Sequence, residues 1–184
     1  MEEFILNETG ELYIRWNINT GYRKLEFNEL IASLIQQYKH LGGTYDAFTQ
    51  TDGKLVGNEK IVIIRNLQEI IQIAIILKHT IYSKFIPEDK RPEDKLKFKF
   101  VDEYSFQITH QYTQTEIEQV KSVKDWYNNF FKLDVLKFME NLKAALEDKV
   151  VTVEEATGLS DILNQIVLGS AILYDKLMHE NLFN

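Results

Sequence analysis

The stretch KIVIIRNLQEIIQIAIILKH, residues 60–79, is the most apolar part of this chain, and the fold depends on how it is interpreted. A membrane-spanning helix needs about 20 predominantly apolar residues. Arg65, Glu69 and Lys78 interrupt the stretch, so its uncharged run, IIQIAIIL, is too short to cross a bilayer. We therefore expect a core element and no contact with a membrane.

Two secondary structures fit this stretch. Its first part, KIVII, is rich in β-branched residues and suits a buried strand, whereas the apolar residues from Leu67 to Ile81 recur at helical spacing. Asn66 and Glu69 have the spacing of a capping box, which opens helices. The pattern favours a strand followed by a helix. One uninterrupted helix is the alternative, but it would place Ile61 on a narrow polar strip.

The N-terminal region predicts an antiparallel meander. An apolar run at 4–6 is followed by segments at 12–18 and 25–27 in which apolar residues alternate with others, and the turn sequences NETG and NTG separate the three. A helix capped by Asn28 should then run to about Leu41, where two consecutive glycines end it. The following segment contains an Asp-Gly turn and is expected to be a short hairpin or a loop.

Residues 95–112 show the clearest alternation of apolar and polar side chains and predict a second hairpin. Before it lies the connector PEDKRPEDK, residues 87–95. Charge-mixed segments that contain proline are typical of solvated connectors. We expect a single domain, 1–184, with a joint at 87–95 between a β-rich N-terminal half and a helical C-terminal half.

The C-terminal half predicts helices with recognisable starts. Thr115 with Glu118 and Thr152 with Glu155 form capping boxes. The apolar face of residues 120–131 is out of register with that of 135–146, which indicates a kink or break near Leu133. The final helix should reach about Met178, and the small residues 169–171 would allow a neighbouring backbone to approach closely. The predicted fold class is therefore α+β: an antiparallel sheet, built from the N-terminal meander and the 95–112 hairpin, packed against four to five helices.

Composition restricts the function. The formal charge is −7 and the isoelectric point is near 5.2, which argues against a nucleic-acid binder because phosphate contacts need a surplus of basic groups. The one candidate basic stripe is Lys95, Lys97 and Lys99, and lysines on a strand also protect exposed sheet surfaces. The chain has no cysteine, and its start lacks the features of a secretion signal, so we expect a cytoplasmic protein.

Aromatic residues in DWYNNFF are the first candidates for an interaction site. Trp126, Tyr127, Phe130 and Phe131 cover more of a helix than one core contact requires, and large aromatic side chains often anchor protein interfaces. The alternative is that a sheet covers one side of this helix and another helix covers the other. The acidic end of the chain, 147–184, is either a second binding surface or simply solvated.

Acidic residues in the last helix are the candidates for a metal site. Glu154, Glu155 and Asp161 could hold magnesium for the hydrolysis of a nucleotide or phosphoester. Acids at the start of a helix also favour its dipole and are commonly solvated. The sequence contains no phosphate-binding loop or nucleophile motif, and we expect no cofactor.

These observations favour a non-enzymatic protein that binds another protein, as a homodimer or in a complex. Its composition, rich in lysine and isoleucine and poor in arginine, is that of an AT-rich genome, and small proteins of this kind are common in phages and mobile elements. Such an accessory protein could inhibit a host factor or assist virion assembly. The alternative function is the magnesium-dependent hydrolase.

Overall fold

The computed structural model describes residues 26–50, 52–91, 113–180 and 183–184 with their side chains, and residues 3–6, 12–15, 23–24, 97–100 and 106–109 by their backbone. Of the residues whose side chains are described, 82% are helical and none lies in a strand. The predicted α+β fold, with an antiparallel sheet packed against helices, is therefore wrong. The protein is helical.

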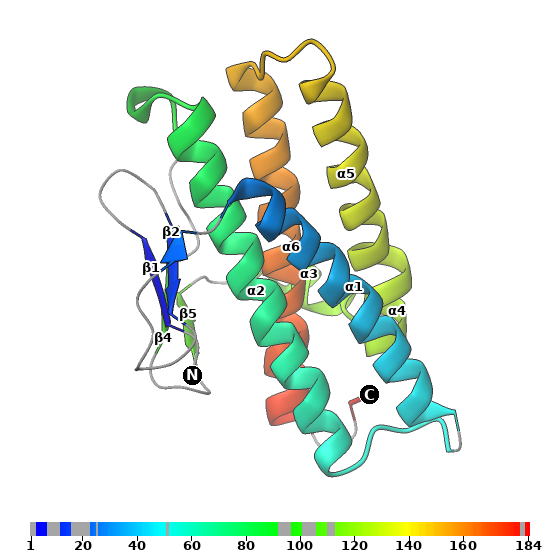
Figure 1. Cartoon of the computed structure of the whole chain (residues 1–184). Helices are drawn as coiled ribbons and strands as arrows, with labels where there is room; N and C mark the ends of the chain where they lie inside the picture. The colour runs from blue at the N-terminus through cyan, green and yellow to red at the C-terminus, as the bar shows by residue number, and fades with distance from the viewer. Residues whose placement is uncertain are drawn as a thin grey trace.

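In the part of the chain that the structure describes, four long helices form the body. They are α1 (Phe27–Thr49), α2 (Asn58–Phe85), α5 (Lys132–Leu146) and α6 (Val153–His179). The shorter helical elements are η1 (Glu88–Lys90), α3 (Gln114–Gln119), α4 (Val123–Trp126) and the π-helix η2 (Tyr127–Phe131). Figure 1 shows α2, α6 and α5 side by side, with α1 running obliquely across the front of the bundle.

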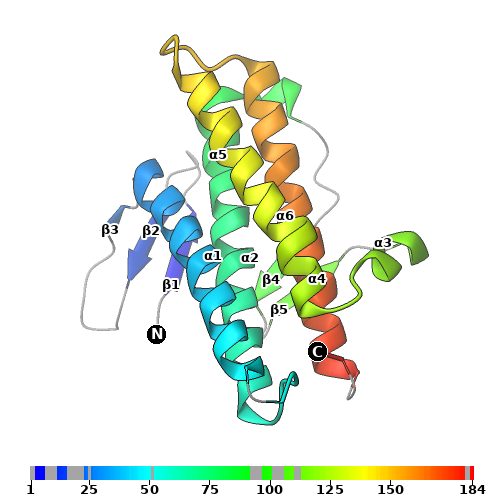
Figure 2. The same ribbon diagram turned by 90° about the vertical axis from the view of Figure 1, so that its right-hand side faces the viewer.

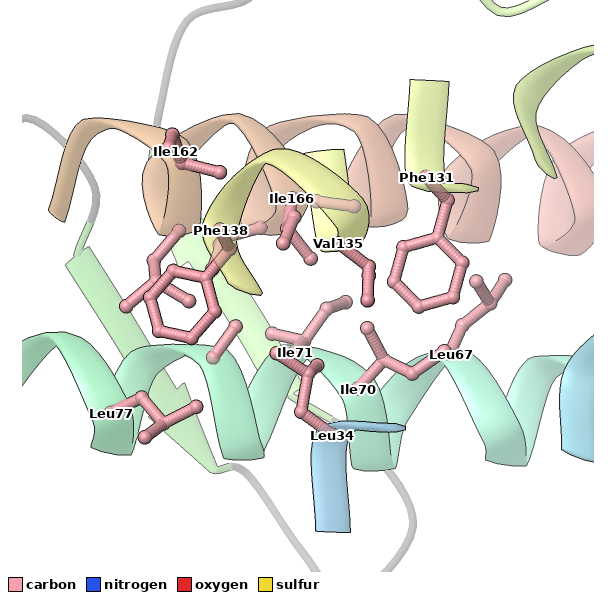
Figure 3. Close-up of a cluster of buried hydrophobic side chains, with 14 of the residues drawn as sticks. Leu34, Leu67, Ile70, Ile71, Leu77, Phe131, Val135, Phe138, Ile162 and Ile166 are labelled. Carbon is pink, nitrogen blue, oxygen red and sulfur yellow. The ribbon is translucent and has the colours of Figure 1, made fainter. Parts of the chain in front are cut away.

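The core lies where these helices meet, because each turns an apolar face inward. In Figure 3, leucine and isoleucine side chains of α2 fill the space below α6, while Val135 and Phe138 enter from α5 and Leu34 from α1. Leu34, Phe138 and the core residues of α2 in this view are fully buried. Burying one such side chain contributes about 1.5–3 kcal/mol to the free energy of unfolding.

Residues 60–79 lie in one uninterrupted helix, α2, so the predicted strand at the start of this stretch is wrong. Ile63 and Leu67 are completely buried on the same side of α2, and this packing outweighs the weak helix propensity of β-branched residues. Asn66 does not cap a helix: it is 6% exposed in the interior of α2. Ile61 is 47% exposed, so the helix tolerates the apolar residue that argued against it.

Helix α1 is also longer than predicted. It begins after Glu26, whose side chain takes part in a capping box with Glu29, and not after Asn28. Gly42 and Gly43 lie inside the helix, which therefore replaces the first part of the predicted hairpin or loop. The Asp52 turn is present: the Lys54 amide donates to its Oδ1 at 2.9 Å.

The described strands form two small separate sheets. One has the order β1 (Glu3–Leu6), β2 (Leu12–Arg15), β3 (Arg23–Lys24), and the other pairs β4 (Lys97–Phe100) with β5 (Phe106–Thr109). All pairings are antiparallel. The predicted joint at 87–95 extends beyond the described residues, which end at 91 before β4.

The predicted break near Leu133 has a different form. Helix α4 continues through η2 into α5, and in η2 the Lys132 amide donates to the carbonyl of Tyr127, five residues earlier. A π-turn adds one residue to the helix, so the apolar face is shifted without a break.

The first capping box of the C-terminal half lies two residues earlier than predicted, between Thr113 and Glu116.

Helix α6 agrees closely with its prediction, beginning after Thr152 in a capping box with Glu155. By length and composition it could cross a membrane, but 61% of its most apolar 18-residue window is buried in the protein. A core helix has the same properties, so this is weak evidence for a membrane span.

After the end of α6, the chain returns to α4. The Asn184 carbonyl accepts from the Val123 amide at 2.8 Å, so Asn184 is joined to the start of α4.

Candidate interaction surface

The aromatic candidates lie at the junction of α4 and η2, and two of them are in the core. Trp126 and Phe131 are each 1% exposed, and their rings stack with centroids 4.8 Å apart. The two residues are five positions apart, a spacing that the π-turn brings onto the same side of the helix. Tyr127 and Phe130 are half-buried against the same core.

Tyr127 attaches this segment to α1. Its ring stacks on Tyr38 at 5.5 Å, and its hydroxyl donates to the Tyr38 carbonyl at 3.2 Å. Burial, followed by the interaction with Tyr38, raises the pKa of the Tyr127 hydroxyl well above its usual value. The ring passes so close to Gly42 that a Cβ there would lie 2.6 Å from Cζ of Tyr127. Gly42 therefore provides space for the tyrosine rather than a helix end.

Trp126 attaches the same segment to α6. A Cβ on Gly169 would lie 2.8 Å from Nε1 of the indole, so this glycine admits the ring. The prediction for 169–171 was that a neighbouring backbone would approach closely; at Gly169 the close neighbour is instead the side chain of Trp126. The aromatic cluster thus joins α4 and η2 to α1 and α6. A partner could contact Trp126 or Phe131 only if these helices separated.

The three acidic candidates do not converge. Glu154 and Asp161 are exposed, and Glu155 accepts from the Thr152 amide in the capping box at 2.9 Å. Among the described residues, no group of three or more histidine or acidic side chains could hold a metal ion. The geometry therefore gives no support to the hydrolase.

Two other carboxyl groups have shifted pKa values. Partial burial raises the pKa of Asp134 to about 6, and the nearby positive charge of Lys137 opposes this shift. Burial also raises the pKa of Asp175, opposed by His179. Neither shift in pKa could be predicted from the sequence, because both shifts depend on tertiary packing.

The outer face of α5 carries exposed leucines. Leu133 is 56% exposed and Leu136 is 51% exposed, whereas Val135 and Phe138 on the opposite face are buried. Charged residues, among them Lys137 and Glu140, lie on the same exposed side. An apolar area rimmed by charges is typical of a protein interaction site.

Sequence reasoning missed this surface for a local reason. In KLDVLKFMENL, residues 132–142, apolar side chains occur on nearly every turn, and either leucine could belong to a core face. Only the register set by the π-turn decides that Val135, Phe138 and Leu142 point inward. Once that register is known, Leu133 and Leu136 are the two leucines that do not belong to the core face, and this would have identified the surface.

The predicted basic stripe cannot be placed in full. Lys95 lies outside the described residues, and for Lys97 and Lys99 the structure describes the backbone of β4. Nucleic-acid binding therefore gains no support from the described part of the chain.

Comparisons of the chain with protein-family models, with curated proteins and with solved structures found no match.

Proposed function

We propose that this chain is a non-enzymatic accessory or assembly protein of the cytoplasm that acts by binding another protein through the outer face of α5. The observation that supports this most directly is the exposure of Leu133 and Leu136, each more than half accessible on a helix whose other face is packed in the core. Covering apolar surface of this kind in an interface is favourable. The phage or mobile-element setting remains an expectation from composition.

The position of the leucines supports a docking role over a folding role. Core positions of α5 are already filled by Val135, Phe138, Leu142 and Ala145, which are buried. Leu133 and Leu136 lie three residues apart, so they are neighbours on one face of the helix. Their side chains are thus available to a partner without any rearrangement of the bundle.

The test is to replace both leucines by glutamate and to compare proteins captured by chemical cross-linking in the cells that make this chain. The control is Ile61→Glu with Met178→Glu, because these residues are 47% and 50% exposed on other helices. We expect quantitative mass spectrometry to show cross-linked proteins with the wild type and the control that disappear with Leu133→Glu and Leu136→Glu. Captured proteins that are the same for both double variants would contradict the proposal.

A further inference from the structure

The exposed side of α5 has a repeating pattern. Leu133, Lys137, Glu140 and Ala144 are all exposed and are separated by four, three and four residues. This spacing places them along one straight stripe of a helix, the arrangement through which two helices pack in a coiled coil. In Figure 2, α5 runs along the front of the bundle. We call these four residues the α5 stripe.

The α5 stripe is complementary to itself in the antiparallel direction. Its midpoint lies between Lys137 and Glu140, which are equally distant from it and opposite in charge. The next pair outward, Leu133 and Ala144, is also equally distant and combines a large with a small apolar side chain. When a second copy of the stripe is placed antiparallel against the first, each lysine therefore faces a glutamate and each leucine faces an alanine.

We propose that the partner on this face is a second copy of the chain, bound by antiparallel packing of α5 on α5 about a two-fold axis through the midpoint of the stripe. This inference rests on the proposed function and names its partner. A two-fold axis makes every contact occur twice. The dimer would contain two Lys137–Glu140 pairs and two Leu133–Ala144 contacts, with Leu136 beside the stripe on each side.

Charge complementarity favours a second copy over an unrelated partner. At the midpoint, an antiparallel copy meets each charge with its opposite, whereas a partner of a single charge sign would repel one of the two residues. Like charges brought together at an interface are unfavourable, so the pattern also selects one register and direction. A single pair of helices buries less surface than a standard interface of about 1,600 Å², so we expect a weak, concentration-dependent dimer.

The test uses two opposite charge reversals. In Lys137→Glu both central residues are acidic, and in Glu140→Lys both are basic, so each variant repels its own copies. A mixture of the two places acid against base at both contacts. We expect sedimentation equilibrium up to about 1 mM to show a wild-type dimer, an increase of at least about tenfold in the dissociation constant of each variant, and recovery of dimer in the mixture.

Matched controls are Lys39→Glu on α1 and Asp161→Lys on α6, which reverse exposed charges away from the stripe. Circular dichroism checks that all variants keep the helical content of the wild type. A wild type that stays monomeric, variants that dimerise like the controls, or a mixture that does not recover the dimer would each overturn the proposal. If the chain is monomeric but its cross-linked partners still require Leu133 and Leu136, protein binding stands and the homodimer is wrong.

Discussion

Gly42 and Gly43 are adjacent in α1 but have different surroundings. A Cβ on Gly42 would meet the hydroxyl of Tyr127 and lie 2.6 Å from Cζ, whereas a Cβ on Gly43 would meet nothing within 4 Å. Tyr127 cannot move away freely, since its ring stacks on Tyr38 and its hydroxyl donates to the Tyr38 carbonyl. The helix therefore needs glycine at the first position only.

We predict opposite effects of alanine at these two glycines. Gly43→Ala should raise the free energy of unfolding by about 0.5–1 kcal/mol through helix propensity. Gly42→Ala gains the same term but overpacks the tyrosine at a cost of about 1–3 kcal/mol, so a net loss is expected. Urea unfolding of both variants measures the difference. Equal stabilisation by the two substitutions would show that Tyr127 yields without cost.

Asp134 should make stability depend on pH. Its pKa is raised from 3.8 to about 6 because partial burial disfavours the charged form. Between these pH values the folded state still holds the proton, whereas the unfolded state has released it. The contribution of the protonated Asp134 to the free energy of unfolding is therefore present at low pH and is lost as the pH rises through 6. Asp134→Asn, which cannot ionise, should therefore unfold at a higher temperature than the wild type at pH 7.

The pH series supplies the control for that substitution. Well below pH 3.8 the wild-type carboxyl is protonated in both states, and the difference in melting temperature between the two proteins should disappear. A difference that is constant with pH would mean that the substitution acts through packing and not through ionisation.

The π-helix η2 links two segments of helix whose apolar faces are out of register. One extra residue lets Trp126 and Phe131 stack five positions apart, while Val135 and Phe138 still reach the core. Asn128, within the π-turn, is exposed. The sequence therefore contains one residue more than a continuous α-helix would need.

We predict that deletion of Asn128 is tolerated. The π-turn would become an α-turn, Trp126 and Phe131 would be four residues apart, and both apolar faces would stay in place. Deletion of the exposed Asn141 in α5 is the matched control, because it rotates Leu142 and Ala145 out of the core. Thermal unfolding should remain cooperative in the first variant and be lost or strongly lowered in the second. Equal damage from both deletions would contradict this explanation.

At the scale of the whole molecule, stability is concentrated in α2 and α6. These two helices pack along their length and supply most of the buried side chains among the described residues, including Leu67, Ile70, Ile166 and Leu173. Helix α3 (Gln114–Gln119) contributes no buried residue. Segments with few buried apolar contacts open at a lower free energy than core elements.

Hydrogen exchange should follow this division. We expect the amides in the middle of α2 and α6 to exchange only through global unfolding, and those of α3 to exchange through local opening that is orders of magnitude faster. Mass spectrometry of peptic fragments measures both in one experiment. Protection of α3 equal to that of α6 would show that α3 is covered by another part of the molecule or by a second copy.

The sequence alone determined the features that depend on neighbouring residues. The capping box of Thr152 and Glu155 predicted the start of α6, and the helical spacing of apolar residues predicted where that helix ends. The change of apolar face near Leu133 marked a local irregularity, although it was interpreted as a kink or break and the structure has a π-turn. The small residues near Gly169 marked a close contact, although the neighbour is a side chain and not a backbone. These signals act within a few turns of one helix, so they hold whatever the rest of the chain does.

Tertiary structure decided the features in which local preference is weak. Asn66 and Glu69 have the spacing of a capping box, yet the helix is continuous through Asn66 because Ile63 and Leu67 are buried on one side of α2. Gly42 looks like a helix end, but the ring of Tyr127 occupies the space that its missing side chain leaves. Propensity differences amount to tenths of a kcal/mol per residue, whereas burial of one core side chain contributes about 1.5–3 kcal/mol. For that reason the packing of the four helices, and not the local pattern, fixed the fold class and turned the aromatic residues inward and the two leucines of α5 outward.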